Sequence, residues 1–200
     1  MRAVLKDAAS RALAMARGRH ALSWGALALA MCGDSRGAQG LLDEMARRFP
    51  QDSFIKASWL PMTHAAIDRH GHRPAEAIER LQAARRDETG DQAALWPAYL
   101  RGLAYLDQGA LSETDGEFQE ILDHTGVLAP AVFNPVGLTL HPLARLGHAR
   151  TAARMGHLDE SRKAYEALFA LWKDADPELP ILRSARREHR QLAVAAQLTP

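Results

Sequence analysis

From Gly102 to Phe118 the chain reads GLAYLDQGALSETDGEF, and this stretch decides the fold. Small Gly102 is followed one helical turn later by bulky Tyr105, and Gly109 closes this pattern. A second small-then-bulky pair, Thr114 and Phe118, begins directly afterwards. Residues three or four positions apart lie on one face of a helix, and glycine suits a tight turn. The stretch therefore predicts two packed helices joined by a turn.

The same order recurs along the chain. Gly33, Gly71 and Gly109 are 38 residues apart, and Gly156 follows Gly109 after 47 residues. The pairs seven and four positions before these glycines are Ala26 and Leu29, His64 and Ile67, Gly102 and Tyr105, and Ala149 and Ala152. A helix pair cannot bury its apolar face alone, so a regular period predicts stacked repeats.

We therefore predict an all-α fold, an α-α superhelix of about four helix pairs with a leading and a capping helix. Helix formers dominate the composition, and β-branched and aromatic residues are few. The predicted units are a partial leading repeat at 1–18, repeats at 19–50, 53–88, 91–124 and 142–174, an irregular insertion at 125–141, and a capping helix at 178–198. The predicted helix N-caps are Ser35, Ser53, Asp91 and Ser112.

The order of small, bulky, glycine, small and bulky residues resembles the tetratricopeptide repeat from about Ala21 to Trp172. Pro50, after the first unit, matches the terminal proline of that repeat. The resemblance implies a solenoid whose concave groove binds a peptide or a partner helix.

Three tracts of the second half carry a narrower resemblance: YLRGLAY at 99–105, EFQEILDH at 117–124 and LWKDADPELPIL at 171–182. They are similar to the C-terminal tetratricopeptide region of acidobacterial-type serine/threonine protein kinases and of winged-helix transcription regulators. In that family the catalytic or DNA-binding module lies N-terminal to the repeats. The resemblance therefore implies a sensory or scaffolding role. The kinase glycine-rich loop, His-Arg-Asp loop and Asp-Phe-Gly motif do not occur in this chain, so we do not expect an enzyme.

Composition excludes several partner classes. The net charge of +1 is too small to favour nucleic acid or an anionic membrane. The longest apolar run, Ala26 to Cys32, is far shorter than the roughly 20 residues of a membrane span. We expect a cytoplasmic protein, or an extracytoplasmic one if the chain belongs to a longer membrane-anchored protein. His64, Asp68 and His72 are spaced four apart, but Gly71 interrupts their helix, so we predict no metal and no cofactor.

The repeat register predicts which side chains line the concave groove: His20, Ser23, Leu27, Ser58, Asp68, Trp96, Tyr99, Leu103, Arg150 and Arg154. Trp96 and Tyr99 are the candidate anchors, because rigid aromatic residues often dominate interfaces. The alternative is that both rings pack at a helix end near Pro97. Arg150 and Arg154 are one helical turn apart, and their positive charges are compatible with an acidic peptide as the ligand.

Three hypotheses for function remain open at this point. The first is a non-catalytic protein-interaction or scaffolding module, the sensory or regulatory region of a bacterial signalling protein. The second is a small-molecule or metal-binding function centred on the insertion at 128–142. The third is self-association through the end helices.

Overall fold

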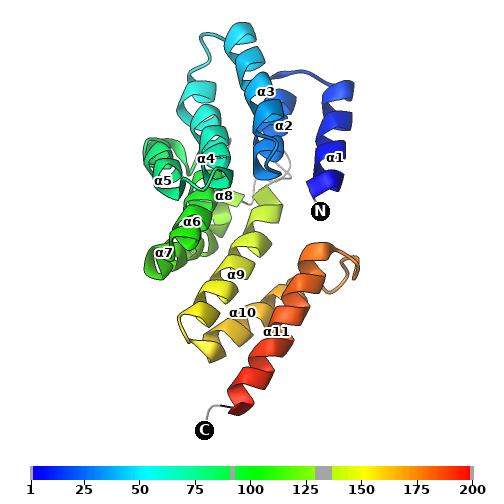
Figure 1. Ribbon diagram of the computed structural model, residues 1–200, viewed down its shortest axis with the longest axis vertical. Coiled ribbons are helices and arrows are strands. Elements are labelled where there is room, and N and C mark those ends of the chain that lie inside the picture. The colour runs from blue at the N-terminus through cyan, green and yellow to red at the C-terminus, as the bar shows by residue number, and fades with distance from the viewer. Residues whose placement is uncertain (1, 91–92, 129–136, 199–200) are drawn as a thin grey trace.

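The computed structural model describes residues 2–90, 93–128 and 137–198 (Figure 1). Every regular element in these ranges is a helix, which confirms the predicted all-α class. The α-helices are α1 (Arg2–Met15), α2 (Arg19–Met31), α3 (Ser35–Arg48), α4 (Leu60–His70), α5 (Pro74–Gln82), α6 (Trp96–Gln108), α7 (Leu111–Asp123), α8 (Thr125–Leu128), α9 (Gly137–Arg154), α10 (Leu158–Leu171) and α11 (Pro180–Leu198). A π-helical turn, Ile55–Trp59, leads into α4, and a 3₁₀ turn, Arg85–Asp87, follows α5.

Helices that are neighbours in sequence pack as antiparallel pairs: α2 with α3, α4 with α5, α6 with α7, and α9 with α10. Each pair also contacts the next one, with α1 packed on α2 at one end and α11 on α10 at the other (Figure 1). In addition, α2 contacts α4, α4 contacts α6, and α6 contacts α9. The first helices of successive pairs thus lie against one another, and the pairs follow in chain order along the molecule.

Three of the four predicted turn glycines adopt the left-handed conformation. Gly33, Gly109 and Gly156 have φ values of 81°, 79° and 83°, a region that other residues rarely enter. Gly71 is different, because its φ is −79° and His72 takes the left-handed position with φ 58°. The second unit has one extra residue in its turn, which moves the left-handed position one residue beyond the glycine.

The predicted N-caps are wrong where the structure describes them. Asp34 rather than Ser35 caps α3, because its side chain accepts a hydrogen bond from the backbone amide of Gly37 at 2.9 Å. Before α4, Asp52 rather than Ser53 acts as the cap. Its carboxylate accepts hydrogen bonds from the backbone amides of Phe54 and Ile55, at 3.0 and 2.9 Å. An ionised carboxylate forms stronger hydrogen bonds than a hydroxyl, which favours the aspartate in each Asp-Ser pair. Ser112 lies inside α7, whose start has no side-chain cap.

The predicted insertion is partly helical. Thr125–Leu128 forms α8, and α9 begins at Gly137, so the predicted boundary between the insertion at 125–141 and the repeat at 142–174 falls inside a helix. Pro142 lies within α9, where it removes one backbone hydrogen bond near the helix start. Leu140 and Ala144 on this part of α9 are buried in the core, and their burial stabilises the additional turn. Residues 129–136 of the insertion, and the predicted cap Asp91, lie outside the described residues.

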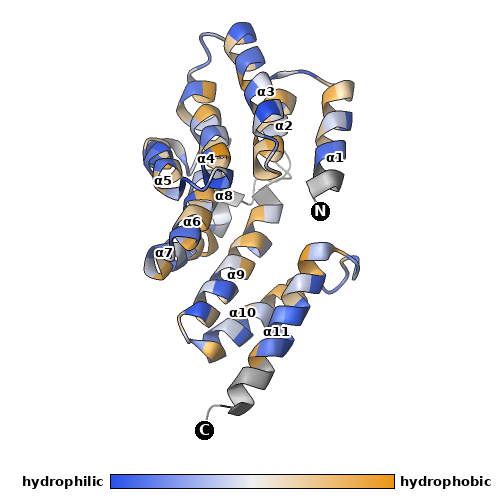
Figure 2. Cartoon of the chain, in the orientation of Figure 1, coloured by the Kyte–Doolittle hydropathy of each residue, from blue (hydrophilic) through white to orange (hydrophobic). Residues whose placement is uncertain are grey.

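The buried apolar residues form two clusters that divide within α9. The larger cluster runs from α1 to the first half of α9. The smaller one joins α9, α10 and α11 through Leu146, Tyr165, Leu168 and Ala185. Hydrophobic and hydrophilic residues share the same helices, as the amphipathic patterns require (Figure 2). Across the part of the chain that the structure describes, none of the helices combines the length and apolarity of a membrane span.

A buried ion cluster fixes the connection between α5 and α6. Arg101 has no exposed surface, and its guanidinium binds both oxygens of Glu117 at 2.8 and 2.6 Å. It also donates to Glu88 at 2.8 Å and to the Leu81 carbonyl at 3.3 Å. Arg85 contributes a second positive charge to Glu117 at 2.6 Å, so the two carboxylates face two guanidinium groups. Because every charge has a partner, the cluster stabilises the loop without leaving a buried unpaired ion.

Candidate binding cleft

A cleft of about 460 Å³ lies where the end of α6 meets α9, α10 and α11. This volume is in the range of roughly 300–1,000 Å³ that is usual for ligand sites. Its lining residues are Leu106, Arg150, Ala153, Arg154, Tyr165, Glu188, Gln191 and Leu192.

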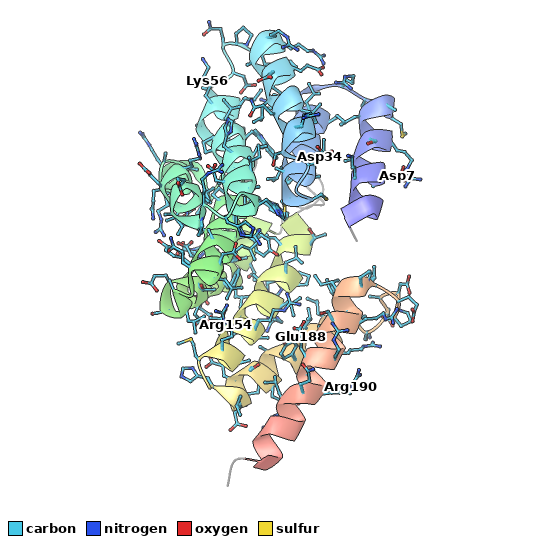
Figure 3. The ribbon with its side chains drawn as sticks, in the orientation of Figure 1. Asp7, Asp34, Lys56, Arg154, Glu188 and Arg190 are labelled. Atoms are coloured by element: carbon cyan, nitrogen blue, oxygen red, sulfur yellow. The ribbon has the colours of Figure 1, made fainter. Side chains whose placement is uncertain are left out.

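Helix periodicity brings these residues to one place. On α9, Arg150, Ala153 and Arg154 are three and four positions apart and share a face. On α11, Glu188, Gln191 and Leu192 repeat the same spacing. In Figure 3, Glu188 lies on the side of α11 that is turned toward α9, whereas Arg190 lies on the other side. The cleft is therefore formed by two facing helix surfaces.

Glu188 is the centre of the polar part of the cleft. Its carboxylate accepts two hydrogen bonds from Arg150, at 2.8 and 2.9 Å. The hydroxyls of Tyr165 and Ser184 also donate to it, at 2.8 and 2.7 Å. This network links α9, α10 and α11 through one side chain.

The same contacts determine the protonation states. Burial by itself would raise the pKa of Glu188, but the hydrogen bonds from Arg150, Ser184 and Tyr165 outweigh burial and lower the pKa to about 2. Burial and the hydrogen bond to Glu188 raise the pKa of Tyr165 well above its ordinary value. The pKa of Arg150 is also raised, because the contact with Glu188 outweighs the effect of burial. At neutral pH the site thus holds a stable ion pair and a neutral phenol.

Arg154 is different from Arg150, because it is exposed and has no carboxylate partner among the described residues. One of its guanidinium nitrogens donates to the carbonyl of Leu106 at the end of α6, at 3.2 Å. That contact holds the side chain at the edge of the cleft. A guanidinium has five N–H donors, so most of them remain available to a bound group.

The structure contradicts the groove position for several predicted residues. Ser23, Leu27 and Asp68 are buried, as are Trp96 and Tyr99, which are only 5% and 8% exposed. Ser58 is fully buried as well. These side chains cannot contact a partner on an open surface, which corrects the prediction that they line the groove.

Aromatic packing accounts for the burial of Trp96 and Tyr99. Trp96 packs edge to face against Trp24 at 5.5 Å and against Tyr99 at 5.6 Å, and Tyr99 then contacts Phe118 at 6.0 Å between ring centroids. These rings come from α2, α6 and α7, so packing between α2 and α6 and within the α6–α7 pair covers Trp96 and Tyr99. Edge-to-face pairs of this kind each contribute about 0.5–1.5 kcal/mol beyond their burial.

The remaining predicted residues differ in exposure. Leu103 is half-buried and packs against the larger core cluster. His20 is exposed at the start of α2. Only Arg150 and Arg154 of the predicted set line the cleft.

Asp68, one of the three residues at metal-ligand spacing, pairs with two arginines. Its carboxylate accepts hydrogen bonds from Arg73 and Arg80, both at 2.5 Å. Burial would raise the pKa of Asp68, but these two contacts lower it overall. Burial lowers the pKa of His64. Within the described ranges, His, Cys, Asp and Glu side chains form no group of three or more that could hold a metal ion.

Two other depressions are larger than the cleft but have mainly polar walls. One, of 680 Å³, lies at the turns after α2 and α4, where Arg69 pairs with Asp107 at 2.5 Å. The other, of 790 Å³, lies between α7, α9 and α10, where His148 contacts Asp115 at 2.7 Å. Neither offers the continuous apolar lining that a binding site usually needs.

Sequence reasoning missed Leu106, Tyr165, Glu188, Gln191 and Leu192 as cleft residues. Tyr165 fits the repeat pattern as a bulky core position, so its hydroxyl gave no separate signal. Glu188 did give a signal in the sequence, because it is an acidic residue among the arginines 183, 186, 187 and 190 of the capping helix. A lone acid in a basic stretch favours a specific ion pair, although its partner cannot be read from spacing.

Comparisons with known proteins add no homologue: no family model matches the chain, and no curated protein and no solved structure matches it.

Proposed function

We propose that this chain is a non-catalytic interaction module of stacked helical repeats, which holds a segment of another protein in the cleft between α9 and α11. The observation that carries the proposal is the cleft itself, because it combines an apolar wall with the guanidinium of Arg154, which has no carboxylate partner among the described residues. Interfaces typically pair an apolar centre with a small number of polar contacts.

The helix arrangement supports a repeat architecture of the tetratricopeptide kind. Successive pairs are stacked, and the first helices of the pairs contact each other from α2 to α9. In such an array the first helices form one surface, on which partner segments bind. Two of these first helices, α6 and α9, line one side of the cleft, and α10 and α11 complete it.

The chemistry of the cleft supports binding rather than catalysis. A general acid or base works best with a pKa near the working pH. Glu188, with a pKa of about 2, stays ionised, and Tyr165 and Arg150, with raised pKa values, stay protonated. This combination favours binding over acid–base catalysis, and the regulatory or scaffolding role is proposed from the resemblance of the sequence to tetratricopeptide regions.

A capture experiment tests the proposal. Ala153→Trp places a large ring in the cleft, and Ala170→Trp makes the same change on the exposed side of α10 as a matched control. The full chain and both variants are immobilised and exposed to extract of the source cells, and bound proteins are quantified by mass spectrometry.

We expect at least one protein to be retained by the wild type and by Ala170→Trp, and to be reduced about tenfold by Ala153→Trp. Thermal melts by circular dichroism verify that both variants are folded. Equal capture of the same proteins by all three chains would contradict a binding role for the cleft.

A further inference from the structure

The charges of the cleft do not cancel. Arg150 and Glu188 neutralise each other through two hydrogen bonds. Arg154 has no such partner within the described part of the chain, so it leaves one uncompensated positive charge at the edge.

The neighbouring surface has the same sign. Along α11, Arg183 pairs with Glu178, but Arg186 and Arg190 have no carboxylate partner among the residues described. Clustered charges of one sign attract oppositely charged partners and speed their association. Arg190 lies on the other side of α11 from Glu188 (Figure 3), so these arginines raise the positive potential around the cleft without lining it. The charge that favours an acidic occupant inside the cleft is that of Arg154.

The wall requires a second property of the occupant. Leu106, Ala153 and Leu192 supply aliphatic surface, and the Tyr165 ring lies at the base. Burying an apolar side chain there is favourable by about 25 cal/mol for each Å² removed from water. A purely polar anion would gain none of this.

We propose that the cleft takes an acidic segment of a partner protein, with an apolar side chain against Leu106 and Leu192 and a neighbouring carboxylate on Arg154. Guanidinium and carboxylate match as paired hydrogen-bonding groups, so this contact orients the segment as well as attracting it. The inference depends on the function proposed above and specifies the chemistry of the partner.

Synthetic peptides test this chemistry directly. One fluorescent peptide alternates aspartate with leucine, a second replaces aspartate by asparagine, and a third replaces it by lysine. Binding to the full chain is measured by fluorescence polarisation at low and physiological salt. Arg154→Gln removes the proposed contact, and Arg190→Gln makes the same change on the other side of α11.

The wild type should bind the aspartate peptide most tightly, and rising salt should weaken that binding. Arg154→Gln should raise the dissociation constant of the aspartate peptide about tenfold, and Arg190→Gln should raise it less than about twofold. Arg154 is exposed, so thermal melts of this variant should match those of the wild type.

Three results would overturn the inference: equal affinity for the asparagine and aspartate peptides, tighter binding of the lysine peptide than of the aspartate peptide, or an equal loss of affinity in Arg190→Gln and Arg154→Gln. If none of the peptides binds while Ala153→Trp still abolishes capture of a cellular partner, the acidic chemistry is wrong and the proposed function stands. If Ala153→Trp captures as well as the wild type, the proposed function itself fails.

Discussion

Phe118 shows how closely two helix pairs approach one another. An added Cβ at Gly102 on α6 would lie 2.8 Å from one edge of the Phe118 ring, and at Gly147 on α9 it would lie 2.5 Å from the other edge. The ring is fully buried and cannot move away from both contacts. Glycine is therefore required at both positions by the close packing of α6, α7 and α9.

Gly147→Ala should lower the free energy of unfolding by about 1–3 kcal/mol, because the new methyl group overpacks the Phe118 site. Urea unfolding followed by circular dichroism measures this. Gly116→Ala is the matched control, since nothing lies near its Cβ position on the exposed side of α7. It should stabilise the protein by up to about 1 kcal/mol, because alanine favours helix. Effects of the same sign for both variants would contradict the described packing.

Glu188 should make stability depend on pH. Its pKa falls from 4.5 to about 2 on folding, so its contribution is complete above about pH 4.5 and is lost as the pH falls toward 2. Glu188→Gln should cost roughly 2–3 kcal/mol at neutral pH, and this difference from the wild type should shrink with falling pH. Urea titrations between neutral pH and about pH 3 measure it. The exposed Glu166→Gln serves as the control, and a difference between wild type and Glu188→Gln that stays constant with pH would disprove the assignment.

For single residues, the sequence predicts which residues share a helix face, but it does not predict which other residues cover that face. Arg150 and Arg154 are four positions apart on α9, and this spacing predicts the shared face that lines the cleft. For Trp96 and Tyr99 the sequence leaves two positions open, the groove wall and a packed helix end, and rings from other helices cover both side chains. Which partner covers a residue depends on distant parts of the chain, and helical periodicity carries no information about it.

The connection between α5 and α6 depends on Arg101. Arg101→Met should lower the free energy of unfolding by about 3–5 kcal/mol, because it leaves the carboxylates of Glu88 and Glu117 buried with fewer partners. Chemical denaturation measures the loss. Arg86→Met, on the exposed side of the same connection, should change stability by no more than about 0.5 kcal/mol. A cost below about 1 kcal/mol for Arg101→Met would show that the ion cluster does not hold this loop.

Helices and most turns were predictable from local pattern. Gly33, Gly109 and Gly156 mark left-handed turns because few other residues tolerate that conformation. The errors occur where tertiary packing outweighs local preference. Pro142 was expected to begin a helix, but burial of Leu140 and Ala144 extends α9 past it in the N-terminal direction. The Arg101 cluster gave no local signal, because its members are far apart in sequence.

For the molecule as a whole, the divided core predicts that the two ends open separately. The smaller cluster joins α9, α10 and α11, and Glu188 is the main polar link among these helices. Arrays of repeats are stabilised mainly by contacts between neighbours, so a local change need not spread.

Glu188→Gln should therefore speed amide hydrogen exchange in α10 and α11 and leave α2 and α6 unchanged. Hydrogen exchange followed by mass spectrometry at neutral pH resolves these segments. Equal acceleration in all helices would mean that the chain opens as a single cooperative unit.

The central claim is that a protein segment binds between α9 and α11, and a backbone NMR titration of the full chain with the aspartate–leucine peptide tests it most directly. Saturable shifts should concentrate at the amides of Leu106, Ala153, Arg154, Gln191 and Leu192, and Arg154→Gln should reduce them. Shifts that are absent, or that concentrate instead on the outer side of α11 around Arg186 and Arg190, would contradict the account.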